Sequence, residues 1–142
     1  ASLYGLMVGA VGFGAMTGAL ALPWLDRRLG ADGLVQAGSA LTAAVLAVLA
    51  LLPIHAVAVA ACAVAGVGWI MVLSCLNVAA QQSLPDWVRG RGLALYGLAF
   101  FGSMTAGALG WGALASLTTI PLALVAAAGL MLAGVGLMRS KP

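Results

Sequence analysis

The stretch Ser83–Gly92 reads SLPDWVRGRG and holds one acid and two arginines within ten residues. The whole chain of 142 residues has only six Lys and Arg and three Asp and Glu, and 64% of it is hydrophobic. Long apolar runs lie on both sides of this stretch. A charged segment with a tryptophan between two such runs is typical of a loop at a membrane surface. The stretch therefore predicts the connection between two membrane spans.

The composition of the whole chain agrees with this reading. Charged residues make up 6% of it, against roughly 25% in soluble proteins, so the chain lacks the residues for a polar surface. We predict an integral membrane protein in contact with the lipid bilayer. The net charge of +3 is explained by loop arginines, and no nucleic-acid partner is expected. Because the sequence opens at Ala1 almost inside an apolar run, we expect a fragment of a longer protein.

The apolar runs predict an all-α, polytopic bundle of transmembrane helices, because open sheet edges cannot face lipid. Each run approaches the roughly 20 residues that a helix needs to cross about 30 Å of hydrocarbon. Five spans are expected, at about residues 4–25, 34–52, 56–81, 93–117 and 121–138.

The charged residues fall in alternate connections between these spans. With five spans, those connections lie on one side, which the positive-inside rule makes cytoplasmic. The amino end of the chain would then lie outside and the carboxyl end inside. The inner-loop charge cluster consists of Asp26, Arg27, Arg28, Asp86, Arg89 and Arg91, and Asp32, Arg139 and Lys141 lie on the same side.

Glycines are concentrated in the expected spans 4–25 and 93–117. Small residues at i, i+4 and i+8 let helix backbones approach closely, so we expect these two spans to pack tightly or move against their neighbours. The span 34–52, rich in Ala, Leu and Val, is expected to face lipid. The alternative is that glycine is simply common in membrane helices. The helix-packing candidates are Gly14, Gly18, Gly107 and Gly110.

The sequence contains no pattern typical of an enzyme. His55 has no carboxylate near it in sequence, and Cys62 and Cys75 are too far apart for a CxxC motif. We therefore predict no catalytic residues, no metal and no cofactor. The expected spans also contain no Asp, Glu, Lys or Arg of the kind that marks a proton relay.

A polar stripe is the best candidate for a binding site. Ser74, Asn77 and Gln81 follow one another at i, i+3 and i+7, which places them on one helix face. Such a face is costly toward lipid, so it should meet either other helices or a water-filled cavity. Tyr96, Ser103 and Thr105 are weaker candidates, because Ser and Thr can bond their own backbone.

The opening stretch also has a local interpretation. Ser83 and Asp86 have the spacing of a capping box, with Asp in place of the usual Glu. We expect a short helical turn that ends at Gly90, with Gly90 and Gly92 letting the chain turn into the next span. The simpler alternative is a loop that only fixes topology.

Three segments resemble the major facilitator superfamily of transporters. They are Asn77–Tyr96 (NVAAQQSLPDWVRGRGLALY), Phe100–Gly112 (FFGSMTAGALGWG) and Gly14–Gly30 (GAMTGALALPWLDRRLG). Within the superfamily they are most similar to the bacterial exporters grouped with the enterobactin (siderophore) exporter. The resemblance implies helices eight to twelve of a twelve-helix transporter of the bacterial inner membrane, with the amino-terminal half missing.

The resemblance also implies a function and a site. The function is export of a small organic molecule by alternating access, with Asn77, Gln81, Gly102 and Thr105 near the cavity or its inner end. From the charge cluster itself we hypothesise that Asp86 or Asp26 pairs with an arginine of the neighbouring loop when the inner side is closed. One departure is that Leu22 fills the acidic slot of the family's loop signature, so the gating role of that acid is not carried over. The alternative function is a non-transporting, five-span scaffold or subunit.

Overall fold

The computed structural model of the chain describes residues 2–52 and 54–139. These residues form four helices, α1 (Ser2–Leu51), α2 (His55–Gln82), α3 (Arg89–Leu117) and α4 (Ile120–Arg139). Within the described ranges, all four are long and apolar enough to cross a membrane. The chain is therefore an all-α membrane protein, and Lys141 lies outside the described residues.

The expectation of five spans is wrong: the described residues give four candidate membrane spans. The expected spans 4–25 and 34–52 both belong to α1, and no loop separates them. The reason is local, because inside α1 only Gly30 leaves the helical conformation, with φ 67° and ψ 173°. This combination of angles is essentially restricted to glycine, so one residue replaces the expected loop.

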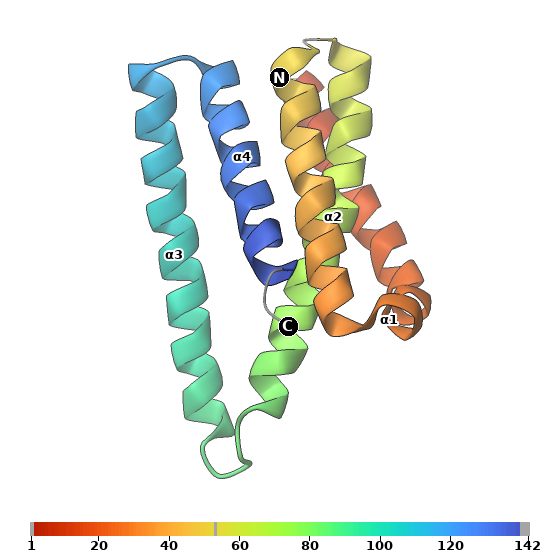
Figure 1. The fold of residues 1–142 in the computed structure, drawn as a ribbon, viewed down its shortest axis with the longest axis vertical. Coiled ribbons are helices and arrows are strands. Elements are labelled where there is room, and N and C mark those ends of the chain that lie inside the picture. Colours follow the sequence, from red (N-terminus) through yellow and green to blue (C-terminus); the bar gives the residue numbers. More distant parts are fainter. Residues whose placement is uncertain (1, 53, 140–142) are drawn as a thin grey trace.

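Gly30 bends α1 into two arms, residues 2–29 and residues 31–51. In Figure 1 the first arm, in red, descends to the bend, and the second arm, in orange to yellow, returns from it. A straight helix of 50 residues would be about 75 Å long at about 1.5 Å per residue, far beyond the hydrocarbon thickness of about 30 Å. The bend therefore decides how α1 fits a bilayer.

Helix α2 packs between the two arms, and glycines make both contacts. A side chain at Gly66 would overlap the carbonyl of Val11 in the first arm, and a Cβ at Gly68 would lie 2.8 Å from Thr42 Oγ1 in the second arm. Residues two apart on a helix point about 200° apart, so these glycines serve opposite faces of α2. The second arm was expected to face lipid, and this is corrected because Leu34 and Ala43 are each only 1% exposed.

The remaining two helices differ in how they pack. Helix α4 packs against α1 and buries Ala123 and Ala128. Helix α3 contacts α2 and α4 only sparsely, and none of its residues is buried. Figure 1 shows α3 standing apart from the rest of the bundle. The chain therefore has one tightly packed part, around α2, and one helix, α3, that has no buried residue.

The charged segments gather toward one end of the bundle. In Figure 1 the α2–α3 connection lies at the bottom and the bend of α1 lies in the lower half, whereas the α3–α4 connection lies at the top. The bend carries Asp26, Arg27, Arg28 and Asp32, and the α2–α3 region carries Asp86, Arg89 and Arg91. The two charged segments thus lie in the same half of the bundle but apart from each other.

Candidate functional site

A cleft of about 500 Å³ lies between α2 and α3, above the connection that joins them. Its polar side chains are Asn77 and Gln81 from α2 and Tyr96 from α3. Its apolar wall includes Trp69, Phe100 and Phe101. The volume falls within the roughly 300–1,000 Å³ of small-molecule sites, which typically combine an apolar lining with a few polar groups. The cleft is therefore a candidate binding site of this chain.

Aromatic rings organise the wall of the cleft around Phe100. The centroid of its ring lies 6.0 Å from that of Tyr96, 6.4 Å from that of Trp69 and 5.5 Å from that of Phe101. Tyr96 and Phe100 are stacked, with 28° between their planes, whereas Phe100 and Phe101 meet edge to face at 85°. Offset and edge-to-face pairs at these distances are favourable. The cluster joins α2 to α3 where the two helices otherwise barely touch.

The hydroxyl of Tyr96 is buried and has no hydrogen-bond partner in the part of the chain that the structure describes. A buried hydroxyl without a partner costs on the order of 1–3 kcal/mol. Such a group is normally satisfied by water, by a ligand or by another part of the protein. Among the described residues, the Tyr96 hydroxyl is thus the one buried side-chain polar group without a partner.

The sequence-predicted polar stripe divides between two cavities. Asn77 and Gln81 line the cleft, whereas Ser74 lines a separate cavity of about 330 Å³ between α2 and the bend of α1. That second cavity also includes Asp26 and Gln82. Ser74 therefore faces α1, and only the two amides face α3.

Two other candidates, both on α3, lie outside the lining of the cleft. Gly102 is exposed with open space around it, and Thr105 is exposed. The hydroxyl of Thr105 donates a hydrogen bond to the carbonyl of Phe101, at 2.9 Å, and Ser103 bonds its own helix in the same way. Satisfied hydroxyls of this kind have little need of a further partner.

The packing glycines differ between the two glycine-rich segments. Gly14 lies against the backbone of Ala63, and a Cβ at Gly18 would lie 2.8 Å from the Cγ2 of Ile70. A Cβ added at Gly107 or at Gly110 would meet nothing within 4 Å. Gly14 and Gly18 therefore allow α2 to pack closely against α1. Gly107 and Gly110 have open space around them on α3.

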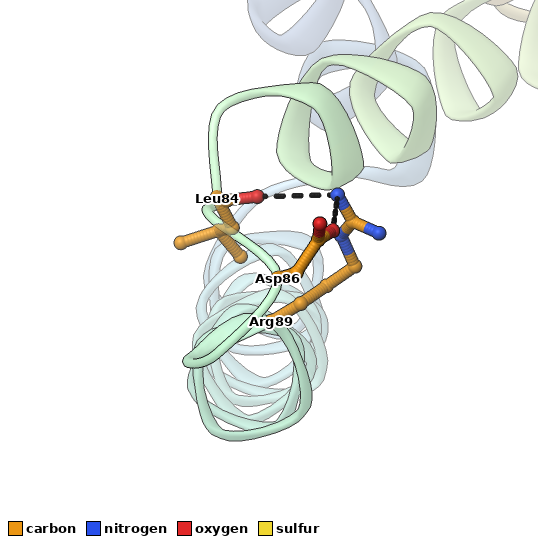
Figure 2. Close-up of polar contacts among 3 residues, drawn as sticks. All are labelled: Leu84, Asp86 and Arg89. Atoms are coloured by element: carbon orange, nitrogen blue, oxygen red, sulfur yellow. Dashed lines mark hydrogen bonds and ion pairs between the residues drawn. The ribbon is translucent and has the colours of Figure 1, made fainter.

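Figure 2 shows the connection between α2 and α3, the two helices that line the cleft. Asp86 Oδ1 lies 2.6 Å from Arg89 Nη2, which also donates to the carbonyl of Leu84 at 3.4 Å. Asp86 is 88% exposed and Arg89 47% exposed. This is the one ion pair among the described residues, and it lies within a single connection rather than between two loops.

The expected capping box is wrong, because Ser83 ends α2 instead of beginning a turn. The hydroxyl of Ser83 donates back to the carbonyl of Ala80 at 3.1 Å. Gly90 is already inside α3, so it does not end a helical turn. A Cβ at Gly92 would lie 2.5 Å from Leu84 Cδ1, which shows that this glycine makes room for Leu84. The closest contact within this connection is therefore the packing of Leu84 against Gly92.

The bend of α1 has its own charged contact. The guanidinium carbon of Arg28 lies 4.3 Å from the centroid of the Trp24 ring. This distance is within the range of a cation–π interaction. Arg28 is thus held against Trp24, which lies one turn earlier in the same helix. Asp26 lines the cavity next to α2.

Of the aromatic residues of the cleft, only Tyr96 was among the sequence candidates. Trp69, Phe100 and Phe101 read as ordinary apolar residues of membrane spans, and only their positions in space bring them to one wall. A local signal did exist, because Tyr96 and Phe100 are four residues apart and must share a helix face. The contribution of Trp69 depends on how α2 meets α3.

A bundle of four helices, each long and apolar enough to cross a membrane, defines an integral membrane protein among the described residues. Residues 1–141 of the chain match the family described as transmembrane secretion effector, of the major facilitator type. The chain belongs to this family. The match does not distinguish the enterobactin exporter-like group within the superfamily. No curated protein and no solved structure matches the chain.

Proposed function

We propose that the chain is the carboxyl-terminal part of a secondary active transporter that exports a small organic molecule by alternating access. The observation that carries the proposal is the cleft between α2 and α3, with Asn77, Gln81 and Tyr96 as its polar groups, in a member of a major facilitator family. In such transporters, substrate sites lie between helices near the middle of the membrane.

The open faces of α3 support a missing partner. A helix of 29 residues without a buried residue is unusual inside a bundle. Its small and polar residues, among them Gly102, Thr105, Gly107 and Gly110, are the types that membrane helices use to pack together. We propose that the amino-terminal half of the same transporter covers these faces and completes the cavity around the cleft.

The charge distribution supports an orientation. We propose that the end with the α1 bend and the α2–α3 connection is cytoplasmic, because basic residues accumulate in cytoplasmic loops. Because the two arms of α1 run in opposite directions on either side of Gly30, the Ser2 end of α1 would then lie outside and the Arg139 end of α4 inside. The family resemblance favours the bacterial inner membrane as the location.

The inner-loop charges are proposed to bias the balance between inward-open and inward-closed states. Asp86 is paired locally with Arg89, so it would have to exchange this partner for an arginine of another loop. Both side chains are strongly exposed, and exposed pairs contribute only about 0–1 kcal/mol. The cluster could therefore shift a conformational equilibrium without locking it.

The test uses the full-length transporter in proteoliposomes. Gradient-driven flux of candidate compounds is measured for the wild type and for Asn77→Ala and Gln81→Ala. Each lost hydrogen bond is worth about 1 kcal/mol, so we expect roughly fivefold weaker apparent affinity. Gln36→Ala is the matched control, because the Gln36 side chain lines a separate cavity between α1 and α2. This variant should transport like the wild type.

Access to the cleft is tested separately, with single cysteines at positions 77 and 81 after Cys62 and Cys75 have been replaced by serine. A membrane-impermeant thiol reagent should label these positions from either side of the membrane. The ratio of labelling from the two sides should change when substrate is added. If neither position were labelled from either side, and the protein transported none of the tested compounds, the proposal would be contradicted. That result would favour the non-transporting scaffold.

A further inference from the structure

We infer that the cleft between α2 and α3 recognises a planar aromatic molecule without net negative charge. The molecule would be held against the rings around Phe100, with one polar group at the Tyr96 hydroxyl. The inference deepens the proposed transport function and rests on it for the fate of the molecule, but binding can be measured without transport.

The aromatic wall supplies the first reason. Phe100 is half-buried at the centre of the cluster, whereas Trp69 is 46% exposed and Phe101 is 67% exposed. The edge-to-face and tilted arrangements, at 85° and 53°, leave rings in different planes around Phe100. A planar ligand can therefore contact one ring face-on and another edge-on, as aromatic pairs prefer. An aliphatic ligand would fill the same space without this geometric gain.

The Tyr96 hydroxyl supplies the second reason. The hydroxyl oxygen is buried, and the ring that carries it stacks on Phe100. It lacks a hydrogen-bond partner among the described residues. The surrounding side chains cover this oxygen in the empty protein, so a ligand would have to displace them to reach it. A ligand polar group that did so would remove the cost of the unsatisfied hydroxyl and add a hydrogen bond. Asn77 and Gln81, one turn apart on the facing helix, can both donate and accept. The site thus suits an aromatic ring that carries an amine, amide or ring nitrogen.

The charges set the third condition. None of the described residues that line the cleft is charged. Arg89, near the inner end, is paired with Asp86 and bonded to Leu84. The faces of aromatic rings are negative and attract cations, and an anion buried without a partner is strongly disfavoured. This wall therefore favours neutral or cationic ligands over carboxylates and sulfonates.

The experiment compares two probes that share one ring system, 9-aminoacridine as the cation and acridine-9-carboxylate as the anion. Binding to the full-length transporter in lipid nanodiscs is followed by the anisotropy of acridine fluorescence, with empty nanodiscs subtracted. We expect 9-aminoacridine to bind at least tenfold more tightly than the carboxylate. Trp69→Leu and Phe101→Leu keep an apolar side chain but remove the ring, and each should weaken binding roughly three- to thirtyfold.

Tyr96→Phe separates recognition from folding. It removes only the hydroxyl, so it should weaken 9-aminoacridine binding roughly two- to tenfold while raising the thermal stability of the empty protein. Phe13→Leu, an exposed ring on α1 beside a different hollow, is the control and should leave binding unchanged.

Two results would overturn the inference. Equal binding of both acridines would remove the charge selectivity, and unchanged binding in Trp69→Leu and Phe101→Leu would remove the aromatic site. Either result can occur while the wild type still transports other compounds, which would leave the proposed function intact. Conversely, ring-dependent binding of 9-aminoacridine without flux of any compound would contradict transport and preserve the binding site.

Discussion

Replacing Gly30 with alanine should destabilise the packed part of the fold through the backbone alone. Gly30 has φ 67° and ψ 173°, and an added Cβ would meet nothing within 4 Å. Steric overlap with neighbours is therefore excluded, and only the conformational cost remains. Residues held in this region cost on the order of 1–3 kcal/mol. Since about 1.4 kcal/mol is a factor of ten, the unfolding equilibrium should shift by a factor of roughly 5 to 140.

The assay is reversible unfolding of the full-length protein in mixed micelles, with increasing sodium dodecyl sulfate and tryptophan fluorescence as the signal. Gly12→Ala is the matched control, because Gly12 is helical and also has open space around it. Alanine there should stabilise the helix by about 0.5–1 kcal/mol. The two substitutions have the same chemistry, so their difference isolates the backbone conformation.

Gly30→Asn sharpens the test. Asparagine tolerates the left-handed helical region at ψ near 47°, but ψ at Gly30 is 173°, so asparagine should not restore stability. A D-alanine introduced by semisynthesis should restore it, because the mirror image of these angles is ordinary extended backbone. If Gly30→Ala were as stable as Gly12→Ala, or if asparagine rescued fully, the account of the bend would be refuted.

Further predictions concern the same unfolding measurement. Gly14→Leu should lower the free energy of unfolding by at least about 1–3 kcal/mol through overpacking, because Gly14 abuts the backbone of Ala63. Gly12→Leu, the control, should be nearly neutral. Equal effects of the two substitutions would contradict the close approach of α1 and α2. A double-mutant cycle with Asp86→Asn and Arg89→Gln should give a coupling of less than about 1 kcal/mol that vanishes at high salt, and a salt-independent coupling would show a buried pair. Gly92→Ala should cost less than about 1 kcal/mol, since the atom it meets is the flexible end of Leu84, and a larger loss would mean that the connection cannot adjust.

How much of the fold could be predicted from the sequence depends on which feature is considered. The all-α membrane class follows from composition, because 6% charged residues cannot cover a soluble surface. The separation into five spans failed at Gly30, where the charged residues 26–32 suggested a loop. Charge and glycine content indicate where a chain can turn, but they do not show whether the turn needs a loop or a single left-handed residue.

The candidate site was predictable only where one helix determines it. Asn77 and Gln81 share a face of α2 whatever surrounds them, so their spacing sufficed to single them out. Ser74 has a similar spacing but faces α1, because α2 lies between neighbours on both sides. The aromatic wall combines Trp69 with Phe100 across two helices. No pattern within either helix specifies that meeting.

The two walls of the cleft differ in how firmly they are held. The α2 wall is fixed from both sides, since Gly66 admits the first arm of α1 and Gly68 the second. Close backbone contacts of this kind have little freedom to slide, because packed interiors resist deformation. The α3 wall has no buried residue, and its sparse contacts with α2 and α4 are the only ones that hold it within the described chain. A change in the width of the cleft therefore requires movement of α3 but no repacking around α2. A ligand that bridges Trp69 on the fixed wall and Phe101 on the open wall would add contacts at the place where the chain itself makes fewest, and so its binding would be coupled to the position of α3.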